Sequence, residues 1–86
     1  MFLEIITPED KIFEGEVESA SFPGTDGFFQ ILNNHAPMIS TLGKGDVVID
    51  QILEKKRKET TLIVEGGVIE VLNNKVSVLV EHVLDQ

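Results

Sequence analysis

Apolar and polar residues alternate with a period of two along most of this chain. In the segment 76–81 the valines fall on one face, while Ser77, Leu79 and Glu81 fall on the other. Successive side chains of a β-strand point to opposite faces, and strands favour the β-branched residues that fill these runs. The alternation therefore predicts that strands, rather than helices, build the fold.

Turn residues interrupt the alternating runs at short intervals. Pro, Gly, Asn and Asp suit turns because they fix or tolerate the backbone angles that turns need. Short strands at this spacing predict an all-β sandwich or barrel of about nine to ten strands. Nine strands can be placed, at residues 2–7, 11–14, 16–22, 27–32, 36–41, 46–53, 59–65, 67–72 and 75–81.

The segment 49–61 also fits the start of a helix. Ile49, Ile52 and Leu53 have the i, i+3, i+4 spacing of a helical apolar stripe. No hydrophobic residue follows between positions 54 and 61, so such a stripe would end after one turn. We therefore predict two strands joined by a charged hairpin.

Length and charge limit the classes of protein to consider. The 86 residues fit one domain, spanning 1–86, and the absence of cysteine excludes disulfides. The net charge of -8 argues against a nucleic-acid partner, because duplex binding needs Lys and Arg to neutralise phosphates. Four of the seven basic residues form the run Lys55–Lys58. A solvated hairpin tip explains this run best, and contact with anionic lipid or an acidic protein is the alternative.

The sequence contains no targeting or membrane pattern. The start MFLEIITPED has no basic region and reaches a charge at Glu4, unlike a signal peptide. No apolar run approaches the ~18 residues of a membrane helix. We expect a soluble chain, or one held at a membrane by another protein.

Catalytic and metal-binding patterns are also missing. His35 and His82 are the only histidines, and no serine lies in a G-x-S-x-G elbow, so a hydrolytic triad is not expected. His35 has no second histidine nearby, and no phosphate loop of the G-x-x-x-x-G-K-[ST] type occurs. We expect a protein that is not an enzyme, with no catalytic, cofactor-binding or metal-binding residue.

Three segments, in this order and spacing, resemble the N-terminal β-sandwich domain of the epsilon subunit of F-type ATP synthases. The family has a first strand and turn, then a Pro-Gly loop followed by His-Ala-Pro and Leu-x-x-Gly, and finally a Gly-Gly strand and hairpin. The corresponding segments here are LEIITPEDKIFEGEVES, FPGTDGFFQILNNHAPMISTLGKG and VEGGVIEVLNNKVSVLVEH.

The resemblance implies a flattened sandwich of two antiparallel sheets. It also implies a non-catalytic central-stalk rotor subunit of a proton- or sodium-translocating ATP synthase. Such a subunit couples the gamma subunit to the membrane c-ring, without cofactor or small-molecule ligand. It would lie peripherally at the cytoplasmic face of the bacterial inner membrane, touching the membrane only indirectly through the ring.

The resemblance also implies contact residues. In the family, the Pro-Gly loop and the histidine of His-Ala-Pro lie at the end of the sandwich that faces the ring. By position, Phe28 and His35 are expected there as contacts to the c-ring or gamma, with Thr7 and Ser40 nearby. Phe28 departs from the family, in which a polar or acidic residue is more usual.

Alternation admits only one of two neighbouring phenylalanines to the core. Phe29 is expected inside, together with Ile31. Phe28 is either an exposed interface anchor or part of a core that it shares with Leu32.

Two further alternatives concern the whole chain. Many family members continue into a two-helix domain that in some binds ATP, whereas this chain stops at Gln86 after the last predicted strand. It is either a naturally short form or a trimmed piece, and we expect no ATP binding from it. The alternative function is a free-standing β-sandwich that binds a peptide or carbohydrate, although the absence of Trp and Tyr argues against a carbohydrate site.

Overall fold

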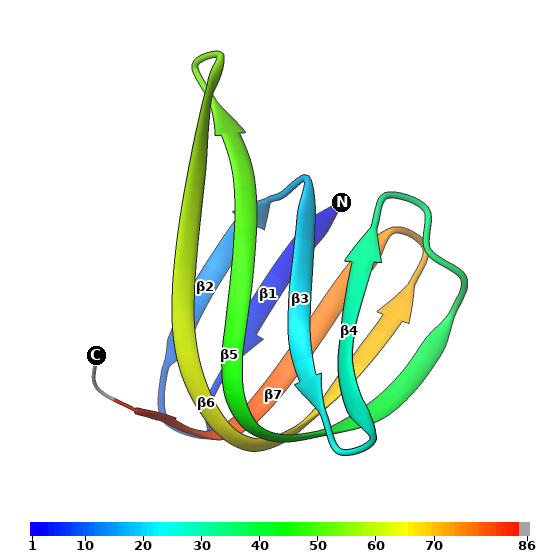
Figure 1. Ribbon diagram of the computed structural model, residues 1–86, viewed down its shortest axis with the longest axis vertical. Coiled ribbons are helices and arrows are strands. Elements are labelled where there is room, and N and C mark those ends of the chain that lie inside the picture. The colour runs from blue at the N-terminus through cyan, green and yellow to red at the C-terminus, as the bar shows by residue number, and fades with distance from the viewer. Residues whose placement is uncertain (85–86) are drawn as a thin grey trace.

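The computed structural model describes residues 1–84, and within them every regular element is a β-strand (Figure 1). None of these residues forms a helix that is long and apolar enough to cross a membrane. The predicted all-β fold is confirmed. The strands are β1 (Phe2–Ile6), β2 (Lys11–Glu16), β3 (Ser19–Gly24), β4 (Gly27–Leu32), β5 (Met38–Leu53), β6 (Lys56–Leu72) and β7 (Lys75–Leu84).

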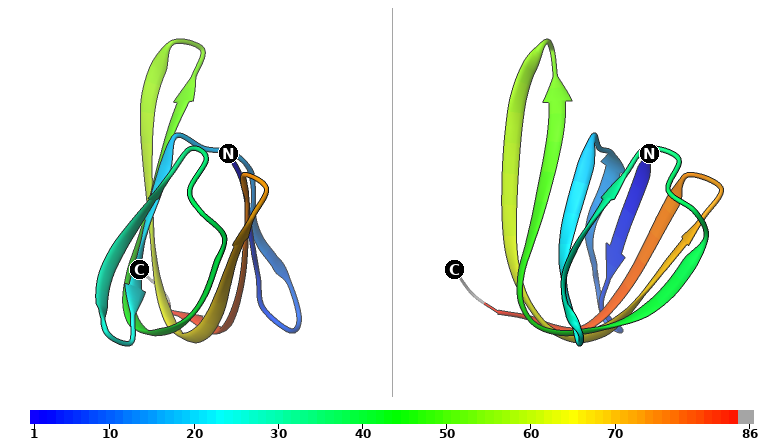
Figure 2. Two further views of the ribbon diagram at one scale, coloured as in Figure 1. Left: turned by 90° about the vertical axis from the view of Figure 1, so that its right-hand side faces the viewer. Right: turned by 45° about the vertical axis from the view of Figure 1, so that its right-hand side comes forward.

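The strands form one hydrogen-bonded ribbon in the order β2-β1-β7-β6-β5-β3-β4, folded over into two layers (Figures 1 and 2). The first layer contains β2, β1 and β7 with the later half of β6 and the early half of β5. The second layer contains the early half of β6 and the later half of β5 with β3 and β4. Two long strands therefore serve both layers.

The described residues form seven strands rather than nine to ten because predicted breaks within β5 and β6 are bends. β5 continues through Gly43 and Gly45, and β6 continues through Gly66 and Gly67. Both strands bend from one layer to the other at these glycines. At Gly67 a Cβ would overlap the carbonyl oxygen of Leu79, and its φ of 154° suits glycine. Glycine thus bends a strand here instead of ending it.

The charged hairpin predicted over residues 49–61 is confirmed, since β5 and β6 pair continuously up to Leu53 and Lys56. One pairing differs from the prediction of two antiparallel sheets. β1 runs parallel to β7, with Leu3 beside Val76, while all other described pairs are antiparallel. No tight hairpin joins the first strand to the last, so neither direction is imposed by a turn.

The core lies between the two layers and consists mainly of aliphatic side chains. The largest fully buried side chains are Phe22, Leu3, Ile5, Ile31, Ile49, Ile69, Val47, Val64, Val71, Val76, Val78 and Val80. Each contributes about 1.5–3 kcal/mol by leaving water. Alternate residues of the same strands face outward, and these outward residues are where a partner can be met.

Candidate functional site

The two neighbouring phenylalanines of β4 face opposite sides, as alternation predicts. Phe29 packs toward the core, with its ring centroid 5.8 Å from that of Phe22 and the rings tilted by 43°. Phe28 points out of the second layer and is 67% exposed. Leu32, on the same side of β4, is also exposed, so the possibility that it shares a core with Phe28 is excluded.

The turn before Phe28 is fixed to the neighbouring long strand. The hydroxyls of Thr25 and Thr41 lie 2.8 Å apart, and the backbone N–H of Thr25 donates to the carbonyl of Thr41 at 3.2 Å. Phe28 follows this anchored turn, beside the buried Pro23 of β3. The exposed ring is therefore presented from a rigid edge of the sheet, as an interface anchor requires.

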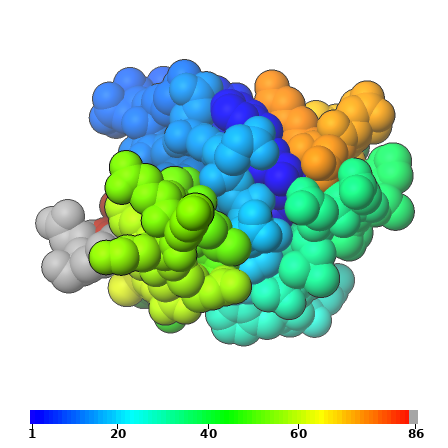
Figure 3. All heavy atoms as spheres, turned by 90° about the horizontal axis from the view of Figure 1, so that it is seen from above, coloured from blue at the N-terminus to red at the C-terminus, as the bar shows by residue number. Residues whose placement is uncertain are grey.

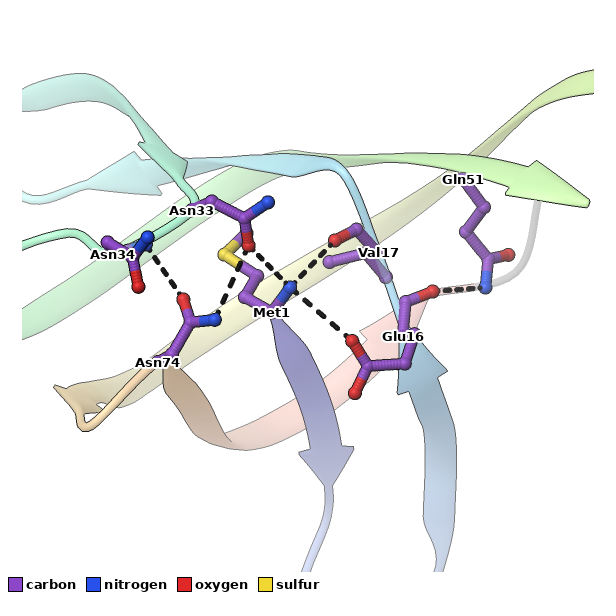
Figure 4. Close-up of polar contacts among 7 residues, drawn as sticks. All are labelled: Met1, Glu16, Val17, Asn33, Asn34, Gln51 and Asn74. Atoms are coloured by element: carbon purple, nitrogen blue, oxygen red, sulfur yellow. Dashed lines mark hydrogen bonds and ion pairs between the residues drawn. The ribbon is translucent and has the colours of Figure 1, made fainter.

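His35 lies in the loop between β4 and β5, which polar contacts attach to the start of the chain (Figure 4). The ammonium of Met1 donates to the side-chain oxygen of Asn33 at 2.7 Å. Next along the loop, the backbone N–H of Asn34 donates to the side-chain oxygen of Asn74 at 2.8 Å. The half-buried His35 ring places Nδ1 2.7 Å from the carbonyl of Ala36, so its orientation is set locally.

The four residues expected near one end are not brought together. Phe28 and His35 lie at opposite ends of β4, which has six residues (Figure 1). At about 3.3 Å per residue, the four steps from Phe28 to Leu32 alone span about 13 Å. The expectation from the resemblance, that Phe28 and His35 lie at one common end, is therefore not met in this structure.

Thr7 lies in the β1–β2 turn, at the end of the sandwich that also carries the turn before Phe28 (Figure 1). Its hydroxyl accepts hydrogen bonds from the backbone N–H groups of Glu9 and Asp10, at 3.3 and 3.0 Å, and so caps this turn.

Ser40 is half-buried, and its partner across the strands is the fully buried Ile69, so its side chain points inward from β5.

A cluster of exposed apolar side chains on the first layer was not singled out from the sequence. Among residues 1–84, four of the eight exposed large hydrophobic side chains lie on the outward side of the first layer: Ile39, Val68, Leu72 and Leu79. Ile6 adjoins them, because it is the neighbour of Leu79 across the parallel pair. We call this surface the outer face, and we include in it the polar residues Glu4, Glu70 and Ser77, which line its shallow grooves.

Register explains how the outer face is assembled. Ile6, Leu79 and Val68 form one cross-strand row, and Glu4, Ser77 and Glu70 form the next. The sequence signal for this surface was present: Leu79 alternates with the buried Val78 and Val80, and Val68 lies next to the buried Ile69. A strand with apolar residues on both parities is covered on both faces, or is available to be covered.

The two carboxylates of the outer face differ in their surroundings. The ammonium of Lys11 lies 3.7 Å from Glu4 and 3.2 Å from Glu14, and Glu14 first, then Glu4, raises the pKa of Lys11. Glu70 has no ion-pair partner among residues 1–84. The middle of the outer face therefore combines aliphatic side chains with an unpaired negative charge, which suits a partner that is apolar and basic.

Comparison with known proteins identifies a family and relatives that match nearly all of this chain. A family model described as "ATP synthase, Delta/Epsilon chain, beta-sandwich domain" matches residues 1–86. The ATP synthase epsilon chain of Leptospira borgpetersenii is 46% identical over 80 residues, which are 93% of this chain and 60% of that protein. The epsilon chain of Chlorobium limicola is 41% identical over 81 residues, which are 94% of this chain and 89% of that protein.

This chain thus spans about 60% of the length of the Leptospira relative and most of the Chlorobium one. Among solved structures, a chain in the central stalk and c-ring of the Tetrahymena thermophila mitochondrial ATP synthase superposes with a TM-score of 0.81. The match covers 98% of this chain and 65% of that chain, at 19% identity. At this identity the likeness concerns the fold alone.

Proposed function

Because this chain belongs to the family of ATP synthase delta/epsilon chain β-sandwich domains, we propose that it is a rotor subunit of the central stalk of an F-type ATP synthase. In this role it performs no chemistry and couples the gamma subunit to the c-ring. It lies at the cytoplasmic face of the bacterial inner membrane and reaches the membrane only through the ring. Residues 1–86 act as one domain.

The observation that supports this proposal is the outer face, which we assign to binding of the gamma subunit. Its exposed aliphatic residues are Ile39, Val68, Leu72 and Leu79, and a soluble chain rarely leaves such a cluster uncovered without a partner. Glu70 adds a charge without an ion-pair partner among residues 1–84, so the complementary surface is apolar with a basic group. His35 lies near the upper edge of this face, where its loop enters β5, and we assign it to the same contact.

We assign contact with the c-ring to the opposite end, which carries the β1–β2 and β3–β4 turns (Figure 1). Phe28 is the anchor there, since a large exposed aromatic on a rigid turn has the properties of an interface hot spot. Thr7 shapes the neighbouring turn. Ser40 points inward behind Ile39, so its role in this proposal is to support the strand that bears the outer face.

The test is a pull-down with purified gamma subunit and, separately, with purified c-ring. Leu79→Ala removes an aliphatic group from the outer face, and Leu32→Ala removes a similarly exposed one from the second layer. We expect Leu79→Ala to weaken gamma binding about 30-fold, the equivalent of about 2 kcal/mol, and Leu32→Ala to leave it unchanged. Equal effects of the two variants, or no binding of the unmodified chain to gamma, would contradict the proposal.

A further inference from the structure

The hairpin that joins β5 to β6 extends beyond both layers of the sandwich (Figures 1 and 2). We call its end, Ile52–Lys58, the basic tip. Within residues 1–84, β3 pairs with β5 as far as Asp50, and β7 pairs with β6 from Ile63 onward. The basic tip is therefore a two-stranded ribbon whose two outer edges do not pair with another described strand.

The ribbon is nevertheless well defined. Its two strands stay paired up to Leu53 and Lys56, and the two residues between them, Glu54 and Lys55, have φ angles of 50° and 67°. Two successive positive φ angles are what a tight type I′ hairpin turn requires. At the root, the side chain of Gln51 donates to the carbonyl of Glu16 at 3.0 Å and ties the ribbon to the first layer.

Charge is concentrated in the basic tip. It holds four basic residues and one acidic residue, whereas the rest of the chain holds three basic and fourteen acidic residues. Arg57 lies 3.7 Å from Asp50, but Lys55, Lys56 and Lys58 have no ion-pair partner among residues 1–84. A positive group on a chain of net charge -8 is attracted to acidic surfaces that repel the remainder of the molecule.

Aliphatic side chains accompany the charges. Ile52 is 50% exposed and lies opposite Arg57, while Leu53 is 45% exposed and lies opposite Lys56. Consecutive residues point to opposite faces, so each face of the ribbon presents one aliphatic and one basic side chain. Figure 3 looks down on the basic tip, whose green atoms are uncovered in that view. A purely solvated tip has no need for two exposed aliphatic residues.

We propose that the basic tip docks on an acidic protein surface of the synthase on the side of this subunit away from the membrane. The orientation rests on the proposed function: the end that carries Phe28 faces the c-ring, and the hairpin projects from the opposite end (Figure 1). The partner surface is acidic, to match three free lysines, and has an apolar centre for Ile52 and Leu53. An anionic lipid headgroup would also be negatively charged, but in this orientation the membrane lies on the other side of the subunit.

The experiment measures association of this chain with the purified soluble part of the synthase, the catalytic head with gamma, in the absence of the ring. Lys56→Glu reverses one charge of the basic tip, and Lys44→Glu makes the same change at the bend of β5, far from it. Lys56→Arg keeps the positive charge and is the conservative control. We expect Lys56→Glu to slow association about tenfold at low salt and little at high salt, with Lys44→Glu and Lys56→Arg unchanged.

Three results would overturn the inference, and they are distinguishable. Equal rates for Lys56→Glu and Lys44→Glu, with the unmodified chain bound, refute the basic tip alone. No binding of the unmodified chain refutes the proposed function and this docking together. Binding to vesicles containing phosphatidylserine that is lost in Lys56→Glu, without an effect on the soluble complex, assigns the basic tip to the membrane instead.

Discussion

Replacing each phenylalanine of β4 by alanine should separate stability from partner binding. Phe29 is partly buried against the core, and its ring centroid lies 5.8 Å from that of Phe22, so Phe29→Ala leaves a cavity and should cost about 3 kcal/mol. Phe28 is 67% exposed, so only a third of its transfer free energy is at stake, about 0.5–1 kcal/mol. The stability of a chain of 86 residues is about 4–13 kcal/mol, so both variants should remain folded at room temperature.

Thermal unfolding followed by circular dichroism measures the difference. For a domain of this size 1 kcal/mol shifts the Tm by about 4–8 °C. We expect the Tm to fall by roughly 12–24 °C in Phe29→Ala and by roughly 2–8 °C in Phe28→Ala. Phe28→Ala should instead weaken binding to the c-ring. Equal shifts, or a larger shift for Phe28→Ala, would show that the register of β4 is wrong and would remove the contact role of Phe28.

Three further results are expected. Gly67→Ala should destabilise the fold by more than about 2 kcal/mol in urea titration, because its Cβ would overlap the carbonyl of Leu79. Gly15→Ala is the control, because a Cβ at Gly15 makes only an ordinary contact at 3.6 Å. Asn33→Ala should lower the free energy of unfolding by about 1.5–3 kcal/mol, because it removes a hydrogen-bond acceptor from the ammonium of Met1. Asn33→Asp keeps the acceptor and should not lower it. Equal losses in the two variants would refute this contact. Far-ultraviolet circular dichroism should show almost no helix, and a helix content above about a fifth would contradict the fold.

Much of the fold could be predicted because alternation and turn chemistry are local properties of the sequence. The inward direction of Phe29 and the hairpin at residues 54–55 both follow from residues within a few positions of each other. The bends at residues 43–45 and 66–67 could not be distinguished from strand ends. Glycine allows both outcomes, and only the packing of one layer on the other selects a bend.

The candidate site was harder to predict because it is assembled from strands that are distant in sequence. Ile6, Val68 and Leu79 become neighbours only through the parallel pairing of the first and last strands, which no turn in the sequence specifies. For Phe28 and His35, the resemblance implied one common end. They are close in sequence, but one strand length separates them in the structure.

The central claim is that this chain connects gamma to the c-ring. It is tested most directly by ATP-driven proton pumping in vesicles that contain an ATP synthase lacking its epsilon subunit. The account predicts that adding the chain restores pumping, that Leu32→Ala restores it equally, and that Phe28→Ala and Leu79→Ala restore it poorly. Pumping that remains absent with the unmodified chain, although the chain is folded and in excess, would contradict the account.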